Sequence, residues 1–377
     1  MTPRAAFVYA DVLAEHQLRE DHPLVPRRLR LCWELLDAYG VFDGQRVVTV
    51  PPRMATEEEV TAFHTREYVA AVRAFSRSDT SAYDPGRFNF TRWGDNPIYE
   101  GMYEAALWST GASLVAAAQV LDGAVAVGAA NFSGGLHHAM PGYASGFCVF
   151  NDPVIAIQAL LRQGKRVAYV DVDAHHGDGV QHAFYDTDQV LTISLHESGL
   201  YLVPGTGFVH ELGVGRGLGY AVNVPLYPYT EDDTYLWAFR QVVPPLVRAF
   251  KPDVLVTQLG IDSHFQDPLT HLCLTSHGFA RVVQEFATLG LPWVALGGGG
   301  YSLDAVARCW ALAFSVMAGV ELPNDIPAPF ATRYGVRYLH DQQRPEVPEA
   351  TREQARRFAE DTVAQLQRTV FPLHGLR

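Results

Sequence analysis

Paired cysteines are absent from this sequence. Its four cysteines are scattered over 377 residues, and no two of them form a C-x-x-C pair. This spacing excludes a thioredoxin-type redox motif and a cysteine zinc knuckle. A chain of this length does not need disulfides, and scattered thiols are typical of a reducing compartment. We therefore expect a cytoplasmic protein.

Long apolar runs are absent as well. The first seven residues contain too few apolar side chains for a secretory signal peptide. No apolar run approaches the roughly 20 residues that a membrane helix requires. The sequence therefore predicts no membrane partner.

Positive charge is scarce, because 29 Lys and Arg residues stand against 41 Asp and Glu residues, for a net charge of -12. Attraction to phosphates needs clustered Lys and Arg, so this balance argues against a nucleic-acid partner. An acidic surface attracts cationic ligands instead, and basic protein segments are one such class.

Short apolar runs alternate with helical stretches along the chain. The predicted strands are residues 5–9, 125–128, 167–171, 190–195, 254–258 and 293–296. The predicted helices are residues 26–39, 97–121, 153–162, 234–250, 276–289, 302–318 and 351–369. The strands are continuously apolar, as expected for a parallel sheet that helices cover on both faces. The pattern predicts a single α/β domain over residues 1–377, with a doubly wound, mostly parallel sheet flanked by helices.

Prolines mark several boundaries in this pattern. Pro97 and Pro153 suit the first turn of a helix, with Asn96 and Asp152 as candidate N-caps. The segment 322–330 contains three prolines and is predicted to be a surface connection. Residues 322–377 would then form a C-terminal extension that ends in a helix.

In doubly wound sheets, ligands bind beyond the carboxyl ends of the strands. The segment after the strand at 167–171 places Asp171, Asp173 and His175 at alternate positions, so that they share one side of an extended chain. Unpaired charge next to a buried strand is costly, and a divalent cation would compensate it. A surface turn with acidic caps is the alternative.

A second carboxylate, Asp262, follows the strand at 254–258. Together with Asp173 and His175 it would make a three-ligand site with room for water, the pattern of catalytic zinc. Fe(II) or Mn(II) could use the same ligands. Taken alone, Asp262 is better explained as a helix or turn cap.

Adjacent histidines, His137 and His138, follow Gly134 and Gly135. Both rings can face one cleft only on irregular backbone, which the glycine pair permits. We interpret them as an acid/base pair. Asp171 and Asp178 are the natural partners, because a carboxylate on one ring nitrogen fixes the tautomer and raises basicity.

Four consecutive glycines, 297–300, precede Tyr301. A phosphate-binding loop is the obvious alternative, but no Lys-Ser/Thr follows and the G-x-G-x-x-G spacing is absent. The glycines are better explained by close approach of the backbone to the site, with the Tyr301 phenol as a hydrogen-bond donor to a developing oxyanion. A core tyrosine is the other explanation. The chain contains no G-x-S-x-G motif for serine catalysis.

These segments together resemble the arginase–deacetylase superfamily, and most closely class I histone deacetylases and the bacterial acetoin-utilisation (AcuC-type) deacetylases. The similarity extends over nearly the whole chain. The matching segments are residues 22–30, 63–68, 94–97, 134–139, 146–152, 170–180, 204–207, 258–268 and 297–301. The resemblance implies zinc-dependent hydrolysis of N6-acetyl-lysine, or a longer acyl-lysine, in proteins. A metal-activated water and a His-Asp general base would perform it.

The resemblance also implies roles for individual residues. Asp173, His175 and Asp262 would bind zinc, with Fe(II) as a possible substitute. His138 with Asp178 would be general base and acid, His137 with Asp171 would position water, and Tyr301 would bind the carbonyl oxygen. The residues that would contact substrate are Asp95 on the rim, with Gly146, Phe147, Val203 and Leu269 along the acyl-lysine tunnel.

Structural potassium is a further implication of the resemblance. One site would use Asp171, Asp173, His175, Ser194 and Leu195, and a second would use Phe184, Thr187, Val190 and Tyr220. Arg28 would lie near an internal cavity for acetate.

One position departs from the family pattern. Val203 stands where family members usually have an aromatic residue before Pro-Gly-Thr-Gly. A tunnel with one aromatic wall, Phe147, should be wider, so we expect better tolerance of longer acyl groups.

Alternative functions remain on the same scaffold. An acetylpolyamine amidohydrolase would also suit an acidic chain, whereas the Asp95 loop favours peptide. A ureohydrolase would need a second metal with more carboxylates than this sequence provides. A non-catalytic acyl-lysine binding module would not need the complete set of ligands, histidines and tyrosine. The sequence assigns no oligomeric state and no physiological target.

Overall fold

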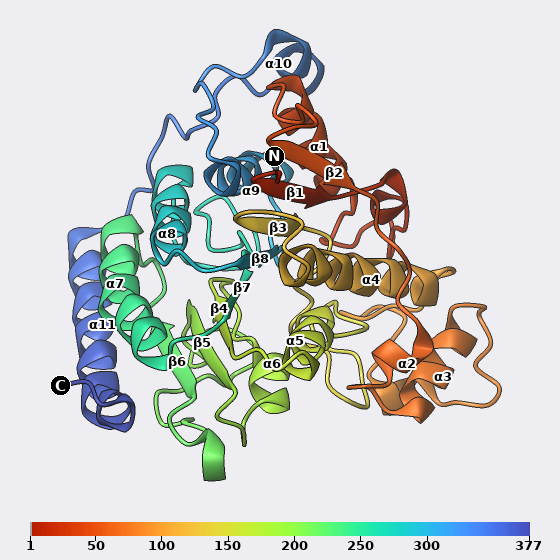
Figure 1. Cartoon of the computed structure of the whole chain (residues 1–377), viewed down its shortest axis with the longest axis horizontal. Helices are drawn as coiled ribbons and strands as arrows, with labels where there is room; N and C mark the ends of the chain where they lie inside the picture. The colour runs from red at the N-terminus through yellow and green to blue at the C-terminus, as the bar shows by residue number, and fades with distance from the viewer. Residues whose placement is uncertain (1) are drawn as a thin grey trace.

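An eight-stranded sheet runs through the centre of the computed structural model, which describes residues 2–377. All of its strand pairs are parallel, in the order β2-β1-β3-β8-β7-β4-β5-β6 (Figure 1). The strands are β1 (Ala5–Val8), β2 (Val47–Val50), β3 (Gly128–Asn131), β4 (Val167–Asp171), β5 (Val190–Glu197), β6 (Ala221–Leu226), β7 (Val254–Gln258) and β8 (Trp293–Leu296). The predicted fold class is confirmed.

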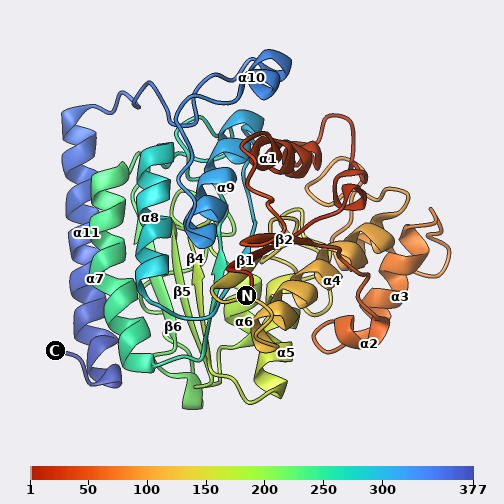
Figure 2. The ribbon, with the colours of Figure 1, turned by 45° about the horizontal axis from the view of Figure 1, so that its top comes forward.

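Helices cover both faces of this sheet. The row α1, α9, α8, α7 and α11 lies on one face, and α4, α5 and α6 lie on the other (Figure 2). Their bounds are α1 (Arg27–Ala38), α2 (Glu57–Val60), α3 (Arg66–Phe75), α4 (Met102–Leu121), α5 (Asp152–Arg162), α6 (Asp178–Ala183), α7 (Asp232–Phe250), α8 (Ser276–Thr288), α9 (Leu303–Ala318), α10 (Ala328–Tyr334) and α11 (Glu349–Thr369). Among residues 2–377, no helix has the length and apolarity needed to cross a bilayer.

The interior strands are buried along their whole length. Every residue of β3, β4, β7 and β8 is buried, because helices pack on both sides of them. This explains why their sequences are mostly apolar rather than alternating, with the polar residues at their carboxyl ends.

The strand order brings together loops that are far apart in the sequence. β3, β8, β7 and β4 are consecutive neighbours in the sheet, although β4 precedes β7 by more than 80 residues in the chain. Their carboxyl ends therefore meet at one edge. The loops that follow these four strands carry the histidine pair, Tyr301, Asp262 and the Asp173–His175 segment, so the fold itself assembles the candidate site.

Two strands escaped the sequence analysis, and both lie at the edges of the sheet. β2 has an exposed residue, Thr49, and so lacks a continuous apolar run. β6 contains Pro225, which cannot donate to a strand ladder and is tolerated at an edge. The predicted strand 125–128 lies too early, because the regular strand begins at Gly128. The amides of Ala126 and Val127 nevertheless already donate to the carbonyls of Pro3 and Arg4.

Some predicted boundaries were also wrong. Asn96 caps no helix, because α4 begins at Met102 with Gly101 as its N-cap. Asn151, not Asp152, caps α5, and its side chain accepts the amide of Val154. The predicted connection 322–330 includes the start of α10, whose Phe330 is buried. Further helices, α2, α3 and α6, were not predicted.

Candidate active site

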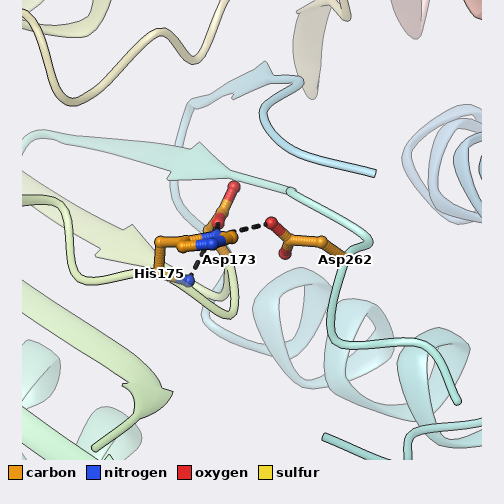
Figure 3. A group of neighbouring side chains, drawn as sticks. All are labelled: Asp173, His175 and Asp262. Carbon is orange, nitrogen blue, oxygen red and sulfur yellow. Dashed lines mark hydrogen bonds and ion pairs between the residues drawn. The ribbon is translucent and has the colours of Figure 1, made fainter. Parts of the chain in front are cut away.

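Three potential metal ligands converge at the carboxyl ends of β4 and β7. Asp173 and His175 follow β4, and Asp262 follows β7 (Figure 3). The ring nitrogen Nδ1 of His175 lies 2.8 Å from Oδ2 of Asp262 and 3.1 Å from Oδ1 of Asp173. One ligand atom from each of the three residues falls within 4.8 Å of the others. The structure therefore brings together the three residues that the sequence predicted as metal ligands from two distant segments.

Hydrogen bonds fix the orientation of both carboxylates. Oδ2 of Asp173 accepts from the Gln258 side chain and from the Gly299 amide, each at 2.7 Å. Oδ1 of Asp262 accepts the Ala174 amide at 2.7 Å. In each carboxylate, the other oxygen faces His175. Gly299 has to be glycine, because a Cβ there would lie 2.1 Å from Oδ2 of Asp262.

The chemistry of this donor set fits a divalent cation. Asp173 and Asp262 are 1% and 0% exposed, and no Lys or Arg of the described chain forms an ion pair with either. Burial and the neighbouring carboxylate of Asp173 raise the pKa of Asp262 to about 8. Two crowded carboxylates and one imidazole are the ligand types that zinc and iron(II) accept.

The histidine pair lies beside these ligands. Nδ1 of His137 is 2.8 Å from Oδ2 of Asp171, and Nδ1 of His138 is 2.7 Å from Oδ1 of Asp178. The two Nε2 atoms lie 3.0 Å apart. Each carboxylate therefore holds Nδ1 and leaves Nε2 directed to a shared space.

The two rings differ in their electrostatic surroundings. Burial alone would lower the pKa of His137, but Asp171 and Asp173 outweigh it and raise that pKa to about 9. Burial, together with the charge of His137, lowers the pKa of His138. The two pKa shifts are opposite in direction, so the two rings of the pair differ in their affinity for a proton.

Asp152 positions the histidine loop, a role that the sequence analysis missed. Its buried carboxylate accepts the amide of Gly135 at 3.0 Å, the amide of Leu136 at 2.9 Å and the Ser113 hydroxyl at 2.5 Å. The sequence suggests that Asp152 caps its own helix, whereas its side chain binds backbone amides of the neighbouring histidine loop.

Tyr301 follows the glycine run after β8 and faces the same pocket. Burial and the nearby carboxylates Asp262 and Asp173 raise the pKa of its phenol well above the usual value, so the phenol keeps its proton. The amide of Tyr301 donates to Oδ2 of Asp267 at 2.8 Å. Asp267 was not singled out from the sequence, because a carboxylate that bonds a backbone amide leaves no motif.

A narrow pocket leads to these groups. Its lining includes His137, His138, Asp173, His175 and Tyr301, with Gly146, Phe147, Arg28 and the glycines 298 and 299. The rings of Phe147 and Tyr301 meet edge to face, with centroids 5.7 Å apart. Gly146 packs against the His138 ring, since a Cβ there would lie 2.4 Å from its Cδ2.

Three predicted substrate residues lie outside this pocket lining. Val203 is 69% exposed and Leu269 is 37% exposed. Asp95 is exposed too, and its carbonyl lies 3.2 Å from Nε2 of His22, whose ring stacks edge to face on Phe147. These residues therefore belong to the outer surface rather than to the deep pocket.

The predicted potassium residues come from β4, β5 and the segments beside β4, β5 and β6. Ser194 pairs with Asp171 across β5 and β4, and its hydroxyl lies 2.8 Å from Nδ1 of His196. The amide of Thr187 donates to the Phe184 carbonyl at 3.4 Å. The remaining members of the two predicted sites, Leu195, Val190 and Tyr220, lie in or beside β5 and β6.

Comparison with known proteins adds a family to this geometry. Residues 22–317 match the family described as the histone deacetylase domain. The chain belongs to the histone deacetylase family. This membership confirms the expected metal-dependent amidohydrolase and the resemblance seen in the sequence.

Relatives within the histone deacetylase family include a bacterial protein at high coverage. The acetoin utilization protein AcuC of Bacillus subtilis (strain 168) is 40% identical over 337 residues, which are 88% of this chain and 86% of that protein. Histone deacetylase 1 of Homo sapiens is 37% identical over 86% of this chain and 66% of its own length. For histone deacetylase HDAC1 of Drosophila melanogaster the identity is 38%, and the match covers 61% of that protein.

Solved structures of the family share this fold. A histone deacetylase homolog from Aquifex aeolicus superposes with a TM-score of 0.85 at 31% identity, over 95% of this chain and 99% of that one. A histone deacetylase homolog complexed with SAHA gives a TM-score of 0.84 with the same identity and coverage.

The histone deacetylase match ends at residue 317, yet the chain beyond it contacts the segment that follows Asp262. Oδ2 of Asp341 lies 2.9 Å from Nε2 of His264 and accepts the Ser276 amide at 2.7 Å, and its Oδ1 pairs with Arg308 at 2.9 Å. His264 is two residues from Asp262. Asp341, His264 and Arg308 are almost completely buried.

Arg28 is a buried residue beside the catalytic pocket. It lines both the catalytic pocket and an adjoining cavity of about 80 Å³, and it donates to the Gly300 carbonyl at 2.9 Å.

Proposed function

We propose that this chain hydrolyses the amide bond of N6-acyl-lysine in proteins or peptides, with acetyl-lysine as the simplest substrate. One observation supports this most strongly: Asp173, His175, two carboxylate-bound histidines and the Tyr301 phenol border a single narrow pocket, and the third metal-type ligand, Asp262, lies against His175. The four free, buried cysteines favour work in the reducing cytoplasm.

Asp173, His175 and Asp262 would hold the metal, which we propose to be Zn²⁺, with Fe²⁺ as the alternative. Bound there, the cation would polarise the amide carbonyl and lower the pKa of water. The structural potassium ions implied by the family resemblance are proposed at the two predicted sites described above, around Ser194 and around Thr187.

His138 is proposed as the general base. Asp178 holds its Nδ1, so the proton on that nitrogen stays in place and Nε2 accepts a proton from water. His138 then returns the proton to the leaving amine. His137, held by Asp171, orients the water and supports the developing charge.

Tyr301 is proposed to donate to the carbonyl oxygen as negative charge develops there. The variant Tyr301→Phe should reduce kcat by about 10²–10³-fold, because one oxyanion donor is lost. Metal content should stay unchanged, since the phenol is not one of the three ligands. Steady-state kinetics together with metal analysis checks both expectations, and a kcat within a factor of three of the parent would contradict the role.

The route to the pocket is proposed to pass Asp95, Phe147, Gly146 and Leu269. Val203 lies at the surface on the Pro-Gly-Thr-Gly loop and leaves the entrance with one aromatic wall. The variant Val203→Phe should lower the ratio of butyryl-lysine to acetyl-lysine hydrolysis by about tenfold, the order of effect of one or two methylenes in a pocket. Competition assays with matched peptides measure the ratio. An unchanged ratio would show that Val203 does not influence the preference for acyl-chain length.

A panel of substrates tests the whole proposal. Protein loaded with zinc, iron(II) or manganese(II) is assayed on acyl-lysine peptides and on acetylpolyamines, before and after chelation. Turnover of peptides that chelation abolishes supports the proposal. Preference for acetylpolyamines would assign the chain to small cationic substrates, which its net charge of -12 would also suit. Binding without turnover would indicate an acyl-lysine binding module.

A further inference from the structure

A closed circuit of hydrogen bonds includes one proposed metal ligand, Asp262, and also Ala174, which lies between the other two in the sequence. The Ala174 amide donates to Oδ1 of Asp262 at 2.7 Å, and the Thr270 hydroxyl donates to the Asp262 carbonyl. His271 follows Thr270 and donates to the carboxylate of Glu197. The amide of Glu197 closes the circuit by donating to the Ala174 carbonyl at 2.9 Å.

Glu197 is an unusual member of this circuit because it is a buried carboxylate at the end of β5. Its side chain is 0% exposed. Oε2 accepts the His271 amide at 2.8 Å, and Oε1 lies 2.9 Å from Nδ1 of the same ring. Among residues 2–377, no Lys or Arg pairs with it, so His271 supplies the hydrogen-bond partners that a buried polar group requires.

The segment that His271 closes carries two parts of the catalytic apparatus. It begins at Asp262, and midway along it Asp267 accepts the amide of Tyr301 at 2.8 Å. Asp267 also accepts the Leu269 amide at 2.9 Å, which ties the middle of the segment to its outer end. Releasing His271 would therefore loosen the Asp262 side of the metal site and the backbone at Tyr301 together.

We infer that Glu197 and His271 are positioning residues that hold the segment from Asp262 to His271 in the geometry needed for metal binding and for Tyr301. This inference rests on the proposed function. Neither side chain lines the catalytic pocket, and the His271 ring is 51% exposed. Their effect must therefore pass through the backbone rather than through contact with substrate.

A pair of substitutions at His271 separates this role from general packing. In His271→Asn, the side-chain amide N–H takes the place of Nδ1–H and can still donate to Glu197. In His271→Ala that donor is lost and the buried carboxylate keeps only a backbone partner. We expect His271→Ala to weaken metal affinity and lower kcat by about tenfold each, the lower end for loss of a group that supports ligands, with a smaller change in KM. His271→Asn should restore both quantities to within about threefold of the parent.

Glu197→Gln tests the same contact from the buried side. Both oxygens of Glu197 face donors of His271, and in the glutamine variant an NH₂ group replaces one oxygen, so that one donor faces another. Glu197→Gln should therefore reduce metal affinity and kcat as much as His271→Ala does. The double variant Glu197→Gln/His271→Ala should be no worse than the more severe single variant. Glu285→Gln is the matched control, because it removes a carboxylate from the Arg240–Glu285 pair between α7 and α8, away from the site. Metal affinity is measured by competition with a chelator, alongside thermal unfolding of the metal-free protein.

The outcomes distinguish this inference from the proposed function. If the parent protein binds no metal and cleaves no acyl-lysine, the proposed function fails. If the parent is active but His271→Ala equals it, or His271→Asn is as poor as His271→Ala, the positioning role is overturned. Should Glu197→Gln fail to fold, the two His271 variants still decide, because they alter a half-exposed side chain.

Discussion

Replacing Asp173 with alanine should remove the metal and almost abolish hydrolysis. The metal is expected to contribute several kcal/mol of transition-state stabilisation, so a loss of about 10³-fold or more in kcat/KM follows. Asp173 supplies one of the three converging ligands and also accepts from Gln258 and Gly299, so its removal takes away a ligand and leaves two donors without their acceptor. Metal analysis of the purified variant and turnover of an acetyl-lysine peptide measure the two effects.

Asp122→Ala provides the matched control for this substitution. Asp122 is exposed at the end of α4, and we expect normal metal content and turnover from its variant. If Asp173→Ala retains a full complement of metal, the ligand assignment is wrong. If it loses metal but keeps its rate, the reaction does not depend on the ion.

His138→Ala should give the second large effect, a fall in kcat of about 10²–10⁴-fold, which is the usual contribution of a positioned general base. The metal should remain bound, because His138 pairs with Asp178 and is not among the three converging ligands. Single-turnover kinetics on metal-loaded protein isolates the chemical step. His182→Ala, at an exposed position of α6, should behave as the parent. A His138 variant with near-normal rate would transfer the base role to His137.

The sequence predicts the interior of the sheet well and its edges poorly. Interior strands such as β4 and β7 are buried on both faces, so their composition alone reveals them. The two edge strands lack this signature for different reasons: Thr49 of β2 is exposed to solvent, whereas β6 is buried but is interrupted by Asn223 and Pro225. Such segments become strands through tertiary pairing, which a local pattern does not contain.

The candidate site divides in a similar way. Residues whose side chains bear the chemistry, such as Asp173 and the His137–His138 pair, occur in short segments with telling spacing. Residues that hold those segments in position have no such recognisable spacing in the sequence. Asp152 fastens the histidine loop, and Glu197 fastens a loop more than 60 residues away in the chain. Their function depends on which backbone amide lies opposite, and only the folded chain specifies that.

The contacts of Asp341 with His264 and Arg308 determine where the chain can be truncated. A gene fragment cut at residue 317, where the family match stops, would encode a chain in which the buried ring of His264 loses its carboxylate partner. Arg308 would lose Asp341 and keep only Asp304 as an ion-pair partner. The same cut would delete α11, whose Thr362 donates to the Pro225 carbonyl, and so uncover the wholly buried edge strand β6. An uncovered strand edge invites pairing with other chains. The shortest active fragment should therefore extend at least through Phe371, because Val370 and Phe371 are buried in the main core.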